Sequence, residues 1–129
     1  MAVNAIGNVG ARVDLALRQG ADFATTLTFT NSDGSTVDLT GCELAAQLRR
    51  SPRSPAPADA VFTVAINAPA TAGIATMSLP AAASAPLVCG NEPSDPASRY
   101  FWDLQLTDAG GLISAPLFGA VTVYPEITR

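Results

Sequence analysis

Residues 99–108 have the sequence RYFWDLQLTD, and this stretch decides the fold. Tyr100, Trp102 and Leu104 are large and apolar, whereas most of the intervening positions are polar. This alternation is typical of a β-strand with one buried face, because successive side chains of a strand point to opposite sides of the sheet. Phe101 departs from the pattern, since it places an aromatic ring on the predicted outer face.

The same alternation recurs on both sides of this stretch, in segments that are separated by turn-forming residues such as NSDGS at 31–35. A helix competes at 42–50, but a strand is favoured because the segment is short and leads into the proline-rich loop 51–59. Pro116 and Pro125 predict an edge or a bend in the closing segment, because proline cannot donate to a β-ladder. The alternating segments are 11–17, 21–30, 42–50, 61–67 and 74–80.

About seven or eight short strands at intervals of about ten residues are typical of an all-β fold, a two-sheet antiparallel β-sandwich. We expect a single domain over residues 11–129, preceded by an N-terminal arm at 1–10. The alanine-rich segment 80–87 predicts one short helical turn. A helical turn that leads to a strand opening with Tyr100 indicates an immunoglobulin-like topology, in which the hydroxyl of such a tyrosine is the expected corner anchor.

Composition argues against several classes of function. The chain has 129 residues, a net charge of −4 and no histidine, so a histidine-dependent nucleophile pair cannot be built. Asp33, Asp38 and Asp103 are the acids a hydrolase would have to use, but they are scattered and suggest no cleft. We therefore expect no enzyme, no catalytic residues, no cofactor, no metal and no small-molecule substrate.

Charge and hydropathy also bear on the partners. The acidic balance argues against nucleic acid, and the cluster Arg49, Arg50 and Arg53 is interpreted as solvating a strand end and loop. No stretch of about 18 apolar residues exists, so no membrane span is expected. Cys42 and Cys89 match no zinc or redox spacing, and two free, largely buried thiols are favoured over a disulfide.

Candidate contact residues come from the arm and from the outer face of the best strand. Phe101 either packs under a loop or contacts a neighbouring subunit, and these two interpretations are about equal. The apolar N-terminal arm is expected to supply a strand that pairs with an exposed sheet edge of a neighbour. The arm residues proposed as interface are Ala2, Val3, Ile6 and Val9.

Three segments taken together resemble a family of small phage and prophage proteins that are often found among tail and tail-fibre genes. They are LRQGADFATTLTFTNSDGSTVDLTG (17–41), GIATMSLPAAASAPL (73–87) and RYFWDLQLTDAGGLISAPLFGAVTVYPEITR (99–129). The chain is also similar in outline to the N-terminal β-sandwich domain of siphophage baseplate upper proteins. The resemblance implies a structural role in the virion, in the tail, baseplate, collar or fibre-attachment region.

From this resemblance we expect a multi-copy assembly or attachment module whose partners are other virion proteins and copies of itself. Its expected location is the virion, assembled in the host cytoplasm. A capsid decoration (cement) protein is the alternative within this class. A host-glycan-binding module is the alternative of another class, although only 6% of the residues are aromatic.

Overall fold

The alternating segments form the strands of a mostly-β protein in the computed structural model, which describes residues 2–4, 10–53, 55–89 and 98–128. In the described part, two short helical segments accompany the strands: the 3₁₀ turn Ala70–Ala72 and helix α1, Ala81–Ser84. The strands are β1 (Ala2–Asn4), β2 (Ala11–Arg12), β3 (Leu15–Arg18), β4 (Phe23–Thr30), β5 (Glu43–Arg49), β6 (Ala60–Ile66), β7 (Ile74–Leu79), β8 (Ser98–Thr107) and β9 (Ile113–Tyr124).

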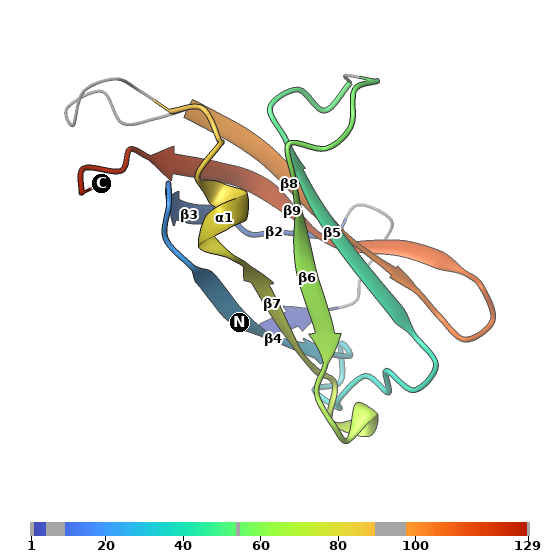
Figure 1. Ribbon diagram of the computed structural model, residues 1–129. Coiled ribbons are helices and arrows are strands. Elements are labelled where there is room, and N and C mark those ends of the chain that lie inside the picture. The colour runs from blue at the N-terminus through green and yellow to red at the C-terminus, as the bar shows by residue number, and fades with distance from the viewer. Residues whose placement is uncertain (1, 5–9, 54, 90–97, 129) are drawn as a thin grey trace.

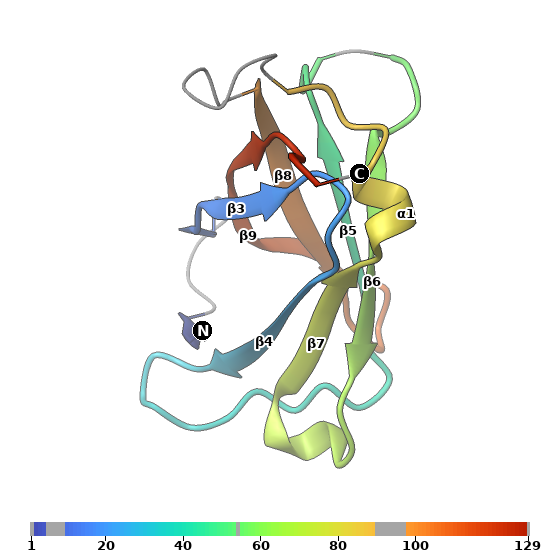
Figure 2. The same ribbon diagram turned by 60° about the vertical axis from the view of Figure 1, so that its left-hand side comes forward.

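The described strands form one curled mixed sheet with the order β1-β4-β7-β6-β5-β8-β9-β2, and β3 also pairs with β9. The bend lies in β6, which pairs with β5 over Ala60–Phe62 and with β7 over Thr63–Ile66. The halves β4-β7-β6 and β5-β8-β9 therefore face each other across the core, and α1 covers one end (Figures 1 and 2). This arrangement corrects the prediction of two separate sheets.

The prediction of antiparallel pairing throughout is also wrong, because β1 runs parallel to β4 and both β2 and β3 run parallel to β9. The predicted strand 11–17 is interrupted at Val13 and Asp14. There the Val13 N–H donates to the Phe118 carbonyl at 2.7 Å, and the Asp14 carboxylate accepts the Ala120 N–H at 3.0 Å. A side chain thus replaces a main-chain acceptor and breaks the ladder between β2 and β3.

The inner faces predicted from alternation are the buried ones. In β8, Tyr100, Trp102 and Leu104 are almost completely buried, whereas Arg99, Phe101 and Asp103 are exposed. The aromatic centre of the core is a pair of edge-to-face contacts in which the ring of Phe62 lies 6.1 Å from the rings of both Phe23 and Trp102. Burial of these alternate side chains is the main force that holds the two halves together.

Proline and the helical turn shape the ends of the sheet. The β8–β9 register shifts between Leu104 and Leu106, opposite the part of β9 that contains Pro116, so the ladder is irregular where an edge or a bend was predicted, although β9 is paired on both sides. Helix α1 is shorter than the predicted turn 80–87, and its first N–H, at Ala81, donates to the Asp22 carboxylate at 2.7 Å. The buried Ser84 hydroxyl fixes α1 by accepting the Gly20 N–H and donating to the Ala21 carbonyl.

None of the helices in the described part of the chain is long and apolar enough to cross a membrane.

Candidate functional site

The outer face of β8 carries the candidate interaction surface. Since β8 pairs with β5 on one side and β9 on the other, its outward side chains lie in the middle of a three-strand face. Phe101 is directly opposite Arg49 of β5 and Ala120 of β9, and 39% of its surface is exposed. Asp103 lies next along the strand on the same side, opposite Gln47 of β5 and Phe118 of β9.

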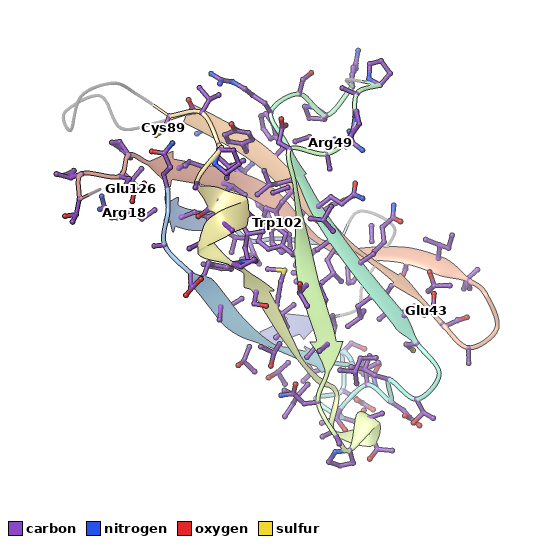
Figure 3. The ribbon with its side chains drawn as sticks, in the orientation of Figure 1. Arg18, Glu43, Arg49, Cys89, Trp102 and Glu126 are labelled. Carbon is purple, nitrogen blue, oxygen red and sulfur yellow. The ribbon has the colours of Figure 1, made fainter. Side chains whose placement is uncertain are left out.

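A shallow hollow of about 200 Å³ lies beside Phe101, lined by Gln47, Arg49, Pro52, Trp102 and Asp103 as well. Ligand pockets for small molecules usually measure about 300–1,000 Å³, so this hollow better fits one inserted side chain. Figure 3 shows Arg49 and Glu43 at opposite ends of β5, so the hollow lies toward the end that carries the loop 50–59.

Arg49 ties this loop to the strand face. Its guanidinium donates to the Ala56 carbonyl and, at 3.4 Å, to Oε1 of Gln47. At the loop base, the Arg50 N–H donates to the Asp59 carboxylate at 2.7 Å. Partial burial raises the pKa of the Asp103 carboxyl, and the positive charge of Arg49 acts in the opposite direction. The hollow therefore already shields Asp103 from part of its water.

The backbone beneath Phe101 is fixed from the core side. Nε1 of Trp102 donates to the Val13 carbonyl at 2.8 Å, which joins β8 to the break between β2 and β3. Gly119 permits this close approach, because a Cβ at that position would lie 2.6 Å from the carbonyl carbon of Val13. The strand that carries Phe101 is thus anchored to the core through the neighbouring Trp102.

Tyr100 lies on the opposite face of the same strand. It is 1% exposed, and its hydroxyl accepts the Val88 N–H at 2.8 Å. The Arg50 guanidinium lies 5.9 Å from the ring centroid. The two β8 residues singled out from the sequence are therefore neighbours in the chain but point to different environments.

The arm residues are only partly described. Ala2 and Val3 belong to β1, which pairs with Thr28–Thr30 of β4 and ends the strand order of the sheet. Ile6 and Val9 lie outside the described residues. The structure thus places the start of the arm at a sheet edge, separate in the strand order from the Phe101 face on β8. The interface role of these residues stays a prediction.

The acids that a hydrolase would need are engaged in turns. The carboxylate of Asp33 accepts both the N–H and the hydroxyl of Ser35, and that of Asp38 accepts the same two groups of Thr40. These hydrogen bonds lower the pKa of both carboxyls. Asp103 lies in strand β8 and is not part of a turn. Across the described ranges, no group of three or more His, Cys, Asp or Glu side chains is placed to hold a metal ion.

The two cysteines are free and half-buried rather than largely buried. The Cys89 thiol donates to Oε1 of Gln19 at 3.4 Å. Gln19 also donates to the Leu87 carbonyl at 2.8 Å and accepts the Glu126 N–H at 3.2 Å, so its side chain joins three segments. Nothing in the local pattern around Gln19 predicted this role, because its partners are more than 60 residues away in the sequence.

Sequence reasoning identified Phe101 but missed two residues that lie near it on the same face. It did not single out Arg99 as a contact residue, and it interpreted Arg49 only as a solvated residue. The signal for Arg99 was present in the period of two, since Arg99, Phe101 and Asp103 must share a face if the segment is a strand. The pairing of Arg49 with Phe101 required knowledge of the strand order.

Comparison with known proteins gives only distant likenesses. No family model matches the chain, and no curated protein matches it. Among solved structures, murine CRIg aligns with a TM-score of 0.38 and 8% identity, covering 88% of this chain and 92% of that one. A structure of VGSC beta subunits aligns with a TM-score of 0.33 and 13% identity, covering 95% of this chain and 97% of that one.

A third solved structure, a family 123 glycoside hydrolase from Clostridium perfringens, aligns with a TM-score of 0.32 and 11% identity. The alignment covers 92% of this chain but only 24% of the hydrolase. Likenesses this distant assign neither a family nor a function to the chain.

Proposed function

We propose that this chain is an immunoglobulin-like structural module of a bacteriophage particle, present in several copies in the tail, baseplate, collar or fibre-connection region. Its function in this proposal is assembly: it joins virion proteins through a sheet edge and through contacts between copies. The observation that carries the proposal is the position of β1 at the end of the strand order, where an added strand has an edge to pair with.

The strand order supports the immunoglobulin-like part of the proposal. Such domains place strands A, B, E and D in one layer and C, F and G in the other. Here β1-β4-β7-β6 and β5-β8-β9 follow those two orders, and β2 and β3 run beside the last strand. Helix α1 precedes β8, and the hydroxyl of Tyr100 bonds to the backbone upstream, as expected of a tyrosine corner.

The phage part of the proposal rests on the resemblance of segments 17–41, 73–87 and 99–129 to small tail-associated proteins. A module of this kind binds by shape and by main-chain hydrogen bonds, so it needs no cofactor. Each contact contributes modest area, and repetition around a particle makes the whole assembly tight because the contacts act together.

The test compares particles assembled with two double variants of the arm. Ala2→Pro with Val3→Pro removes two successive N–H groups, which point to opposite edges of a strand, so pairing is impaired on both sides. Ala2→Ser with Val3→Thr is the matched control, because it keeps both N–H groups. We expect the proline variant to be lost from purified particles, as measured by mass spectrometry, and the control to be retained.

Absence of the unmodified protein from purified particles would refute the proposal. Cryo-electron microscopy of the same particles distinguishes the tail position from capsid decoration, because the density for the domain lies on the tail in one case and on the head in the other.

A further inference from the structure

We infer that the outer face of β8 is a self-complementary surface through which two copies of this chain pair face to face about Phe101. The inference concerns a different surface from the β1 edge, and the pairing is measured on the purified protein alone. The pairing deepens the contacts between copies in the proposed function, and its failure would leave the part of that proposal that rests on the β1 edge intact.

The pattern of charges along β8 carries the inference. Arg99, Phe101 and Asp103 point outward from alternate positions, and all three are exposed. Residues two apart in a strand are separated by about 7 Å, so opposite charges stand at equal distances on either side of one aromatic ring. A two-fold axis that lies between the two faces, perpendicular to β8 and above Phe101, places Arg99 of each copy opposite Asp103 of the other.

Both charges are available for such pairs. Within the part of the chain that the structure describes, neither the Arg99 nor the Asp103 side chain makes a hydrogen bond or a close ion pair, although Asp14 attracts Arg99 and Arg49 attracts Asp103 at longer range. The nearby Asp14 carboxylate is already occupied by the Ala120 N–H and, at 3.1 Å, by Nε of Arg12. Partial burial of Asp103 beside the hollow means that a cation placed opposite is attracted more strongly than in open water.

The residues beside Phe101 on the neighbouring strands allow a second copy to approach the ring closely. On the β9 side its neighbour is Ala120, which is small and 5% exposed, and the next outward residue is the half-buried Phe118. On the β5 side Arg49 lies in the same row as Phe101, where two copies would bring like charges near each other. Its guanidinium is held by the Ala56 carbonyl and by Oε1 of Gln47, so it is not free to turn toward the same residue of the partner copy.

The expected complex has two ion pairs around a central pair of Phe101 rings. Buried aromatic residues surrounded by polar groups are typical of the energetic centres of interfaces. A face only three strands wide belongs to the small class of interfaces, so we expect a dissociation constant of about micromolar order. Such a contact is weak alone but effective where many copies are held together.

Charge reversal provides a sharp test by sedimentation equilibrium. Arg99→Asp and Asp103→Arg each replace two attractive pairs by two repulsive ones, so each should weaken self-association by about a hundredfold or more. An equimolar mixture of the two variants should associate again, because each copy then carries the charge that its partner lacks. The double variant Arg99→Asp with Asp103→Arg should also pair with itself.

Three controls make the result decisive. Arg53→Asp reverses an exposed charge in the loop and should leave association unchanged. Phe101→Ala should abolish pairing without altering the circular dichroism spectrum, since the ring is on the outer face. Added salt should weaken the unmodified pair because the charges lie at the surface. A protein that stays monomeric at about 0.1 mM, or variants that fail to restore each other, would overturn the inference.

Discussion

Replacing Gly119 by alanine tests whether the close crossing of β9 and the β2–β3 break holds the sheet together. A Cβ at this position would lie 2.6 Å from the carbonyl carbon of Val13 and closer still to its oxygen. Both contacts are with backbone, so no flexible side chain can yield. The Val13 segment must therefore move away from β9.

That movement affects two hydrogen bonds made by Val13: its N–H donates to the Phe118 carbonyl at 2.7 Å, and its carbonyl accepts Nε1 of Trp102 at 2.8 Å. Each is worth about 1 kcal/mol net, and leaving the buried indole N–H unpaired adds about 1–2 kcal/mol. Overpacking costs a further ~1–3 kcal/mol. Gly119→Ala should thus lower the free energy of unfolding by about 4–7 kcal/mol, or Tm by about 15–30 °C.

Thermal and urea unfolding followed by circular dichroism and Trp102 fluorescence measure this loss. The matched control is Gly110→Ala in the β8–β9 turn, where the added Cβ would meet only the Asp108 carboxylate at 3.4 Å, which is ordinary contact. The control should change stability by less than about 1 kcal/mol. Equal stabilities of the two variants would refute the role assigned to the crossing.

Three further outcomes follow from single contacts. Tyr100→Phe should cost about 1–3 kcal/mol in urea unfolding because the Val88 N–H loses its acceptor, whereas Tyr124→Phe, on an exposed ring, should be nearly neutral. Hydrogen bonds lower the pKa of the Asp38 carboxyl in the folded state. The carboxylate therefore stabilises the folded protein above about pH 4, and this contribution is lost as pH falls through the folded pKa. Asp38→Asn should flatten that part of an acid-unfolding curve. Burial raises the pKa of the Cys42 thiol. In a Cys89→Ser variant, Cys42 should therefore react with a disulfide reagent more slowly in the folded protein than in urea. Equal rates in the two conditions would contradict this prediction.

Much of the fold could be predicted because alternation records burial directly. Phe23, Thr25, Leu27 and Phe29 were assigned to one face of a strand, and Leu27 and Phe29 are fully buried there while Ala24 is exposed. A shift of one residue would place every apolar side chain in water, so the pattern fixes the orientation of each strand.

Strand partners could not be predicted in the same way, because hydrogen bonds between main chains leave no mark on side-chain identity. Nothing in the sequence of β6 indicates that it pairs with β5 at its start and β7 at its end. The break at Asp14 was equally hidden, since an aspartate in a strand pattern looks like any outward polar residue. Its carboxylate acts as a ladder acceptor only because Ala120, 106 residues away, lies beside it.

The candidate surface could likewise be predicted from the sequence only in part. Phe101 could be identified from one strand, because an aromatic residue on an outer face is conspicuous. The hollow beside it required the positions of Pro52 and Gln47, which come from a loop and a neighbouring strand. Tyr100 was named as a corner anchor from its place near the start of a strand, but the partner of its hydroxyl, the Val88 N–H, depends on how the chain returns after α1.

Alternate residues of β8 face the core and the solvent, so substitutions at even and odd positions should affect different properties. Its even positions, Tyr100 and Trp102, make hydrogen bonds to distant backbone, so changes there alter the free energy of unfolding. Its odd positions, Arg99, Phe101 and Asp103, face solvent, so changes there should leave the core intact and, on the pairing that we infer, alter self-association. Because two neighbouring residues on one strand then give opposite readouts, a variant at Phe101 that unfolded the domain as severely as one at Trp102 would contradict this assignment of the two faces.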